Sequence, residues 1–372
     1  MRNSVTVQIY TGGFGSAPER FDMPAIKDKL LRICKTADVA CVMIGWNPDA
    51  RISAIMDLLR GMGIEAHLWL PVFSGWDGLS PLVGRHGGPV RQDYRAENGE
   101  RFDFGCPADP QNVRFIERVF ETFFSASRYD GVFLDKIRFP GFMSGLQTVL
   151  TCFCPYCSEL HGISEDLDFS EGDNPLHLTA YEGLRYKTGN PGVSRLFDYK
   201  AKAVTESVAS LSGYFRSRGL KVGLDLFAPF LSHFVGQDYG GLAPYADYIK
   251  PMFYRKTNAP AGIPFELDVY ANAFGGGPDA AAKRKGFLLN MLKADVVDSG
   301  LIGREISAIR ENAGCAKLYA GVEINYNEKI APVTARYIQE SIDVMRSADG
   351  VALSWDLCST PDENLDAALE CL

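Results

Sequence analysis

Three acidic residues stand where apolar runs meet polar segments. Asp135 and Glu323 each follow directly after an apolar run, and Asp225 lies between apolar neighbours near the end of another. Two carboxyl groups that flank a glycosidic bond can hydrolyse it, because one protonates the leaving oxygen while the other attacks the anomeric carbon or activates water. The pattern therefore predicts a working pair of Asp135 and Glu323, with Asp225 in support.

Aromatic residues occupy similar positions, close to the ends of apolar runs. Sugar rings present flat C–H faces that pack on indole and phenol rings, while their hydroxyls take hydrogen bonds. A single tryptophan at such a position can equally close the core, so the prediction of a sugar site rests on the set. The aromatics that share this position are Tyr10, Trp46, Trp76, Tyr254, Tyr326 and Trp355.

Basic residues accompany the acids. Lys136 and Arg138 follow Asp135, and three more, Lys250, Arg255 and Lys256, surround a later run. They can bind a carboxylate or sulfate of an acidic sugar, or they can pair with Asp135 and its neighbours and lower their pKa values. Both interpretations stay open from the sequence.

The elements that must position these residues alternate along the whole chain. Eight apolar, strand-like runs are separated by segments of helical period, which is typical of repeated βα units that close a parallel sheet. We expect a single α/β (β/α)8 TIM barrel, in which the carboxyl ends of all strands converge on one face. The predicted strands are Val5–Tyr10, Val39–Ile44, Ala66–Pro71, Gly131–Asp135, Val222–Phe227, Tyr248–Met252, Leu318–Glu323 and Val351–Trp355.

Helices are predicted between these strands, and the spacing is uneven. The helices are expected at Ala25–Thr36, Ala50–Arg60, Val113–Ser125, Asp198–Arg218, Arg304–Asn312, Val333–Arg346 and Asn364–Leu372. The extra length falls after strands three, four and six, at about 74–110, 138–195 and 254–278, where barrel enzymes place their binding loops. Residues 1–372 are therefore expected to form one catalytic domain with these loop insertions.

Three cysteines lie within six residues, at Cys152, Cys154 and Cys157. This spacing lets several sulfur atoms face one centre, and Cys106 would complete a four-thiolate, structural zinc site that joins two long loops. His161 is the reserve ligand, and the alternative is that these are ordinary thiols. The other five, Cys34, Cys41, Cys315, Cys358 and Cys371, are expected to fill the core.

Composition narrows the possible partners. The chain has 372 residues and a net charge of -8, without the basic surface that nucleic-acid phosphates or anionic lipids require. No window has the length of a membrane span, and the N-terminal segment lacks a secretory signal, so a cytoplasmic protein is expected. We expect a carbohydrate as partner and no organic cofactor, while the oligomeric state is not indicated.

Two short motifs carry a resemblance to known families. The segment Asp130–Pro140 resembles the strand-four motif of the hypothetical glycosyl hydrolase families with a barrel fold, and Tyr248–Tyr254 is similar to their strand-six segment. The four cysteines are similar to the zinc cluster of glycoside hydrolase family 42 beta-galactosidases. This resemblance implies a retaining layout, with Asp135 at the acid/base position and Glu323 at the nucleophile position. Family 42 has an Asn-Glu pair where this chain has Leu134 and Asp135, so its galactosidase activity is not transferred.

The sequence thus predicts a glycoside hydrolase, with Asp135, Glu323 and Asp225 as catalytic candidates. The substrate-binding candidates are Trp46, Trp355, Tyr254, Arg138, Lys136 and Tyr10. The alternative is a carbohydrate-binding barrel without activity, in which the same acids only accept hydrogen bonds from sugar hydroxyls. A metal-dependent hydrolase is disfavoured because the chain has only five histidines, and no two have the close spacing of a catalytic metal site.

Overall fold

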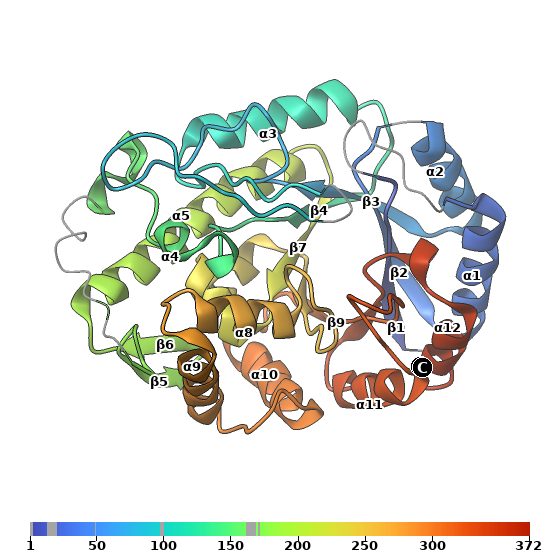
Figure 1. Ribbon diagram of the computed structural model, residues 1–372. Helices are drawn as coiled ribbons and strands as arrows, with labels where there is room; N and C mark the ends of the chain where they lie inside the picture. Colours follow the sequence, from blue (N-terminus) through green and yellow to red (C-terminus); the bar gives the residue numbers. More distant parts are fainter. Residues whose placement is uncertain (1–2, 13–20, 49, 97–99, 161–168, 170–171) are drawn as a thin grey trace.

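Eight parallel strands form a closed barrel, which confirms the predicted TIM-barrel class (Figure 1). The computed structural model describes residues 3–12, 21–48, 50–96, 100–160, 169 and 172–372. The order around the barrel is β1-β10-β9-β8-β7-β4-β3-β2, and all eight predicted strands are present to within two residues. Their bounds are β1 Ser4–Ile9, β2 Asp38–Ile44, β3 Glu65–Pro71, β4 Gly131–Asp135, β7 Lys221–Phe227, β8 Tyr248–Met252, β9 Lys317–Val322 and β10 Gly350–Leu353.

Helices surround the barrel, and all seven predicted helices are present. The helices are α1 Met23–Thr36, α2 Ala50–Met62, α3 Pro110–Phe123, α4 Leu146–Val149, α5 Pro191–Arg216, α6 Pro229–Ser232, α7 Tyr239–Leu242, α8 Ile263–Asn272, α9 Gly277–Met291, α10 Ser299–Asn312, α11 Ala335–Met345 and α12 Asp362–Leu369. Short 3-10 helices lie at Phe142–Ser144, Pro155–Leu160, His233–Val235, Ala243–Tyr245 and Leu357–Ser359.

Several helices begin earlier than the apolar pattern indicates, and in α3 and α5 the first turn is set by a capping side chain followed by proline. The side chain of Asn190 accepts hydrogen bonds from the backbone of Gly192 and Val193, so α5 begins at Pro191. Asp109 caps α3 in the same way, and Pro110 takes the first helical position. A capping side chain followed by proline would have located both starts.

The connections after β4 and β8 contain regular structure that the sequence did not indicate. Within 138–195, β5 (Leu178–Glu182) and β6 (Arg185–Thr188) form an antiparallel hairpin, whose two turn residues, Gly183 and Leu184, have positive φ. The hairpin is anchored to α10 by the Tyr181 hydroxyl, 2.8 Å from Oε2 of Glu305. Within 254–278 lies α8, so this segment is partly helical rather than a plain loop.

The barrel interior changes from apolar to polar along the strands. A central cluster contains Phe133 and Tyr248, whose rings stack with centroids 6.0 Å apart, together with Cys41, Met43, Tyr319 and Ala352. Two residues further along β4, β7 and β8 the side chains are Asp135, Asp225 and Lys250. Because side chains on a strand alternate with a period of two, these polar groups lie above the apolar layer, toward the carboxyl ends of the strands.

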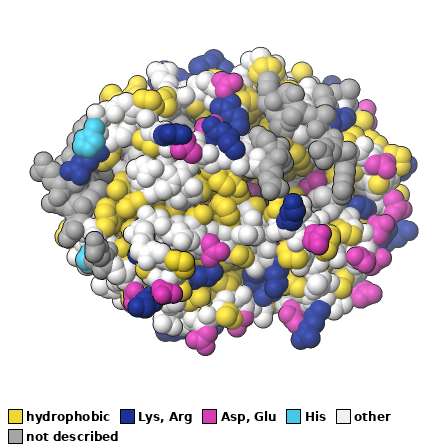
Figure 2. All heavy atoms as spheres, viewed as in Figure 1, with side chains coloured by type: hydrophobic (Ala, Val, Ile, Leu, Met, Phe, Trp, Pro, Cys, Tyr) yellow, Lys and Arg dark blue, Asp and Glu magenta, His cyan; other side chains and the backbone are white. Residues whose placement is uncertain are grey.

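The helices α1 and α12 lie side by side on the outside of the barrel. Figure 1 shows α1 beside α12, and Arg32 joins them through ion pairs with Asp362 and Asp366. Figure 2 shows hydrophobic side chains near the middle of the visible face, with basic and acidic side chains interspersed around them. None of the described helices is both long and apolar enough to cross a bilayer.

The central cluster is expected to dominate the stability of the barrel. Phe133→Ala should lower the free energy of unfolding by about 3–5 kcal/mol, because it leaves a cavity beside Tyr248 in a fully buried layer. Urea denaturation measures the change. Phe123→Ala on α3 is the matched control, since Phe123 is 44% exposed and should lose less than about 1 kcal/mol. Equal losses in both variants would contradict this account of the core.

Candidate active site

The three predicted acids lie at the carboxyl ends of three barrel strands. Asp135 ends β4, Asp225 lies in β7, and Glu323 follows β9 directly. Because Leu134 is aligned with Leu224, Asp135 and Asp225 occupy neighbouring positions on adjacent strands. Burial, with the charge of Asp135 as a further cause, raises the pKa of Asp225 to about 7, although Lys250 opposes the shift. The structure therefore brings Asp135 and Asp225 into one electrostatic unit.

Asp225 is held by a lysine inside the barrel. The Lys250 ammonium lies 3.2 Å from Oδ2 of Asp225 and 2.6 Å from Oε1 of Gln8. Since β8 and β1 are separated by β9 and β10 around the barrel, the contact with Gln8 crosses its interior. Burial lowers the pKa of Lys250, while Asp225 counteracts that effect. Loss of either partner would leave the other charge buried and unpaired.

Asp135 is fixed by two donors and keeps partial exposure to solvent. Its Oδ2 accepts a hydrogen bond from Nε1 of Trp69 at 3.1 Å, and its Oδ1 accepts one from the backbone of Lys136 at 2.5 Å. Lys136 has a φ of 53°, an uncommon conformation for a residue with a side chain. Strained backbone of this kind is often found at functional sites, and here it aims an N–H at the carboxylate.

Glu323 is fully buried between a loop and a helix. Its Oε1 accepts hydrogen bonds from the backbone N–H of Lys256 at 2.6 Å and from the Tyr337 hydroxyl at 2.8 Å. Burial raises the pKa of Glu323 to about 7, and these donors oppose the shift. Glu323 is therefore held from the side of α11, whereas Asp135 is held by Trp69 and its own neighbour.

Several buried polar atoms at the strand ends have no hydrogen-bond partner among the described residues. They are the Tyr254 hydroxyl, Oε2 of Glu323, Nε1 of Trp355 and Oγ1 of Thr11, which follow β8, β9, β10 and β1. An unsatisfied buried polar atom costs about 1–3 kcal/mol, so such atoms usually bind a ligand or ordered water. Their gathering on the face where barrels bind substrates marks it as the candidate site.

Tyr254 is affected by the charges of all three acids. It is buried, and burial together with the charges of Asp225, Glu323 and Asp135 raises its pKa well above the ordinary value. Its ring also lies 5.2 Å from the Lys250 ammonium. The phenol therefore remains protonated at neutral pH and is available as a hydrogen-bond donor beside the carboxylates.

Three aromatic rings form a cluster next to Asp135. The Trp46 ring lies 5.0 Å from that of Trp69 and 5.3 Å from that of Tyr10, in edge-to-face arrangements. Trp46 is buried, whereas Tyr10 and Trp69 are partly exposed. Trp355 is also partly exposed, and its backbone N–H donates to Oδ1 of Asn325 at 3.1 Å. Tyr10, Trp69 and Trp355 thus offer accessible aromatic surface, with Trp46 as support.

The basic residues after β4 have partners other than Asp135. The Lys136 ammonium lies 2.8 Å from Oε1 of Glu100, and its backbone rather than its ammonium contacts Asp135. Arg138 is buried between the rings of Phe104 and Phe227, at 4.4 Å from each, and burial lowers its pKa to about 10. The expected pairing of their charged groups with the Asp135 carboxylate is therefore not what these contacts show.

Two further aromatics from the predicted set lie apart from this cluster. Trp76 is buried, and its Nε1 donates to the carbonyl of Pro71 at 2.8 Å, which fixes the start of the connection after β3. Tyr326 is 50% exposed on the connection after β9. Trp76 thus has a structural contact, whereas Tyr326 remains accessible to a ligand.

Four buried cysteines form a cluster that could bind a metal ion. The sulfur atoms of Cys106, Cys152, Cys154 and Cys157 lie within 4.8 Å of one another. Sγ of Cys106 is 3.4 Å from that of Cys157 and 3.7 Å from that of Cys154, and the last two are 3.6 Å apart. A tetrahedral zinc with Zn–S bonds of about 2.3 Å would separate its sulfur ligands by about 3.8 Å. The cluster therefore has the dimensions of a four-thiolate site.

Polar groups surround the cluster. Hydrogen bonds with the other three sulfurs and burial raise the pKa of Cys106, so all four thiols cannot ionise together without a cation. The backbone N–H of Val83 donates to Sγ of Cys152 at 3.2 Å. Lys200 is fully buried and donates to the carbonyl of Val149; burial lowers its pKa to about 7, and Cys157 opposes this. Its ammonium would offset negative charge on a metal–thiolate centre.

The remaining cysteines only partly match the prediction. Cys41 is buried in the barrel interior, and Cys34, Cys358 and Cys371 are half-buried. Cys315 is exposed, so its assignment to the core was wrong: it lies in the turn between α10 and β9, where few side chains cover it. The reserve ligand His161 lies outside the described residues.

Two residues of the candidate site, Trp69 and Asn325, were not predicted from the sequence. Trp69 bonds to Asp135, and alternation along Glu65–Pro71 would have placed it on the inner face with His67. Asn325 is fully buried and accepts hydrogen bonds from the Ser354 hydroxyl at 2.7 Å and from the backbone of Trp355. Its role depends on the meeting of two loops after β9 and β10, which no local pattern indicates.

No family model matches the chain, and no curated protein matches its sequence. Solved structures are similar to it in fold. They include the PgaB (BpsB) glycoside hydrolase domain from Bordetella bronchiseptica, with 13% identity, a TM-score of 0.53, and coverage of 100% of this chain and 98% of that chain. A beta-galactosidase from Marinomonas ef1 has 10% identity, a TM-score of 0.55, and coverage of 100% and 58%. The spore cortex-lytic enzyme SleL from Bacillus megaterium has 9% identity, a TM-score of 0.51, and coverage of 100% and 74%.

At these identities, the likeness is one of fold. The three solved structures are barrels of carbohydrate-active and cortex-lytic proteins, and they match this chain over its whole length. The family 42 resemblance of the cysteines is not established by them. Function has to be argued from the site itself.

The burial of Glu323 predicts a dependence of stability on pH. Its pKa is about 7 in the folded state and near 4.5 when unfolded, so the folded state binds the proton more tightly. The contribution of Glu323 protonation to the stability of the folded state is complete below about pH 4.5 and is lost as the pH rises to about 7. In Glu323→Gln, the free energy of unfolding should therefore fall less steeply over this interval, as measured by urea denaturation.

A matched control is available on the hairpin. The exposed Glu182 has a lowered pKa because of Lys187, so Glu182→Gln should keep the wild-type slope between pH 4.5 and 7. If Glu323→Gln also kept that slope, the proposed protonation of the buried carboxyl would be incorrect.

Proposed function

We propose that this protein is a glycoside hydrolase that acts at the carboxyl face of its barrel. The observation that carries the proposal is that Asp135, Asp225 and Glu323 all stand at or near the carboxyl ends of barrel strands, on the face where the buried Tyr254 hydroxyl has no hydrogen-bond partner among the described residues. The aromatic rings beside Asp135 offer the flat apolar surface that a sugar ring needs. The shared fold with carbohydrate-active barrels supports the same conclusion.

The proposed working pair is Asp135 and Glu323, in a retaining mechanism. With a pKa of about 7, Glu323 is partly protonated at neutral pH and suits the proton donor. Asp135 is oriented by two N–H donors, is partly exposed and suits the nucleophile. These roles are the reverse of those implied by the family 42 resemblance. Asp225, with Lys250, would position Asp135 rather than react.

Amide variants test the proposal and the choice of pair. Asp135→Asn and Glu323→Gln should each lower kcat by about 10²–10⁴-fold, because each removes a group that donates a proton or attacks carbon. The measurement is hydrolysis of a panel of aryl α- and β-glycosides, neutral and uronic, with the anomer of the product followed by NMR. Asp57→Asn on α2, an exposed residue that forms an ion pair with the exposed Arg60, should retain wild-type activity.

A variant of Asp225 distinguishes between two possible catalytic pairs, Asp135 with Glu323 and Asp135 with Asp225. Asp225→Asn should cost less than either variant above if Asp225 only positions Asp135. Loss of activity in Asp225→Asn with normal turnover in Glu323→Gln would instead identify Asp135 and Asp225 as the pair. Normal turnover in both Asp135→Asn and Glu323→Gln would exclude the proposed mechanism.

A carbohydrate-binding barrel without activity is the second candidate. It is favoured by one observation: Asp225 is 3% exposed and Glu323 is 0% exposed, so two of the three acids are covered. Binding of oligosaccharides without hydrolysis, weakened by Trp69→Ala and unaffected by the amide variants, would support it.

We further propose that the four-cysteine cluster holds a structural zinc. Four thiolates close the coordination sphere, and the cluster joins the connection after β3, through Cys106, to the connection after β4, through Cys152–Cys157. These two connections follow the strands that carry Trp69 and Asp135. Zinc would supply rigidity here rather than chemistry. None of the nine cysteines, all of which lie among the described residues, forms a disulfide, which suits a reducing compartment such as the cytoplasm.

Removal of one ligand tests the zinc proposal. Cys106→Ala should reduce the zinc content, measured by inductively coupled plasma mass spectrometry, from about one ion per chain to a small fraction. The melting temperature should fall by about 5 °C or more, since metal binding contributes to folding. Cys315→Ala, at an exposed thiol outside the cluster, should change neither value. Unchanged zinc content in Cys106→Ala would disprove the assignment.

A further inference from the structure

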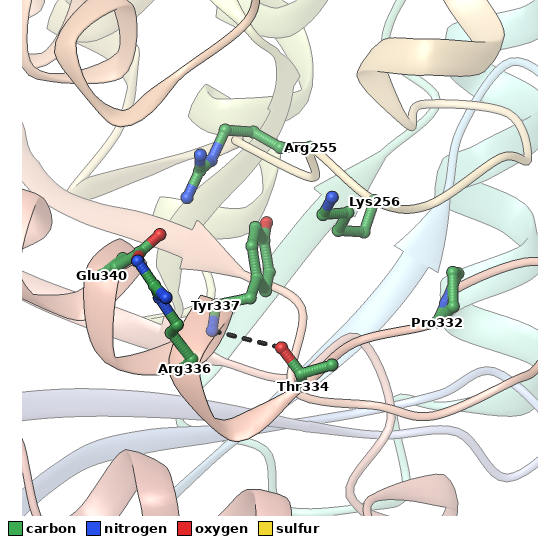
Figure 3. A pocket seen from close by; sticks show the side chains of 7 residues that line it. All are labelled: Arg255, Lys256, Pro332, Thr334, Arg336, Tyr337 and Glu340. Carbon is green, nitrogen blue, oxygen red and sulfur yellow. Dashed lines mark hydrogen bonds and ion pairs between the residues drawn. The ribbon is translucent and has the colours of Figure 1, made fainter.

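A cavity of about 250 Å³ lies between the connection after β8 and the start of α11. Arg255 and Lys256 line it from the connection, and Thr334, Arg336, Tyr337 and Glu340 line it from the helix and its cap (Figure 3). In a βα barrel, each helix begins near the end where the preceding strand finishes. The cavity therefore opens on the same face as the candidate active site.

The wall of this cavity is bonded to Glu323. The same carboxyl oxygen accepts a hydrogen bond from the backbone of Lys256 and another from the Tyr337 hydroxyl. Lys256 and Tyr337 line the cavity and also donate hydrogen bonds to Glu323. A group bound in the cavity would therefore be separated from this proposed catalytic acid by these two residues. This proximity connects the cavity to the candidate site.

Positive charge dominates the cavity lining. Three cationic side chains face one carboxylate, Glu340, which is paired with Arg336 at 2.8 Å. Arg255 and Lys256 lie over the Tyr337 ring, at 4.7 and 5.8 Å. The N-terminus of α11 adds a partial positive charge. The electrostatics therefore favour an anion.

Arg255, which lines the cavity, has one hydrogen-bond donor without a partner among the described residues. Nη2 of Arg255 donates to the Ser341 hydroxyl at 2.7 Å, which fixes the guanidinium. Nε of Arg255 is buried and has no hydrogen-bond partner among the described residues. A buried guanidinium N–H is costly to leave unsatisfied, and an oxyanion is its natural acceptor. Figure 3 shows Arg255 and Lys256 on either side of the Tyr337 hydroxyl.

We propose that this cavity binds the anionic substituent of an acidic sugar, a carboxylate or a sulfate ester. The inference rests on the proposed glycoside hydrolase function, since it names the class of carbohydrate that the enzyme takes. The cavity is smaller than the 300–1,000 Å³ typical of sites for whole small molecules, so it suits one charged sugar unit. Neutral parts of the same chain would lie over the aromatic cluster.

Binding of simple sugars tests the inference without any need for turnover. Isothermal titration calorimetry would compare glucuronate, glucose 6-sulfate and glucose, with wild type, Lys256→Met, Arg336→Met and the double variant. Each single variant should weaken binding of the anionic sugars by about tenfold, because a charge-assisted contact is lost. Lys27→Met, at an exposed position on α1 far from the cavity lining, is the matched control and should change nothing.

The outcomes separate this inference from the proposed function. Equal affinity for glucose and for both anionic sugars, or unchanged anion binding in the double variant, would overturn the inference. A loss of anion binding confined to the cavity variants would support it even if no glycoside were hydrolysed, in which case only the proposed hydrolase would fail. Tighter binding of glucuronate or of glucose 6-sulfate identifies the substituent.

Discussion

The Lys250 ammonium neutralises the buried charge of Asp225 inside the barrel. It reaches from β8 to Asp225 on β7 and to Gln8 on β1, and it is fully enclosed. Without this cation, a second carboxylate next to Asp135 could not remain charged in so apolar a place. Asp225 therefore depends on Lys250, and the field around Asp135 and Tyr254 depends on both. Replacement of the pair by two apolar residues would remove the charges together and would preserve the fold better than loss of one partner.

The two halves of the candidate site are built differently. Asp135 is held by Trp69 of β3 and by the backbone of Lys136 directly after β4, whereas Glu323 is held by α11 and the connection after β8. The first half depends on an indole N–H and a backbone N–H that orient Asp135, and the second on two hydrogen bonds to one buried oxygen of Glu323. The pKa of Tyr254 is raised by burial and by the charges of acids in both halves. A substrate that bridges the halves would engage a rigid aromatic surface and a cationic cavity together.

The sequence predicted the barrel well because short, mainly apolar strand segments alternate with segments of helical period along the whole chain. It placed Asp135, Asp225 and Glu323 at strand ends because each lies at or near the end of such an apolar segment, and the four cysteines by their spacing. Contacts between distant segments could not be predicted. Lys136 meets Glu100 and Arg138 meets Phe104 and Phe227 only after the long connections pack, and Asn325 acquires its partners from the last strand. The helix α8 was missed because its apolar positions are spread around its circumference rather than gathered on one side.

The order of strands around the barrel has a consequence for biosynthesis. β1, the first strand of the barrel to be synthesised, pairs on one side with β10, the last strand of the barrel, and Val5 lies opposite Val351 in that pairing. Until the final strand is made, one edge of β1 has no partner strand, and apolar edges of this kind promote aggregation. The nascent chain must therefore remain protected over most of its synthesis. A truncation within β10 would leave two open edges, on β1 and β9, and should abolish soluble expression rather than merely weaken the fold.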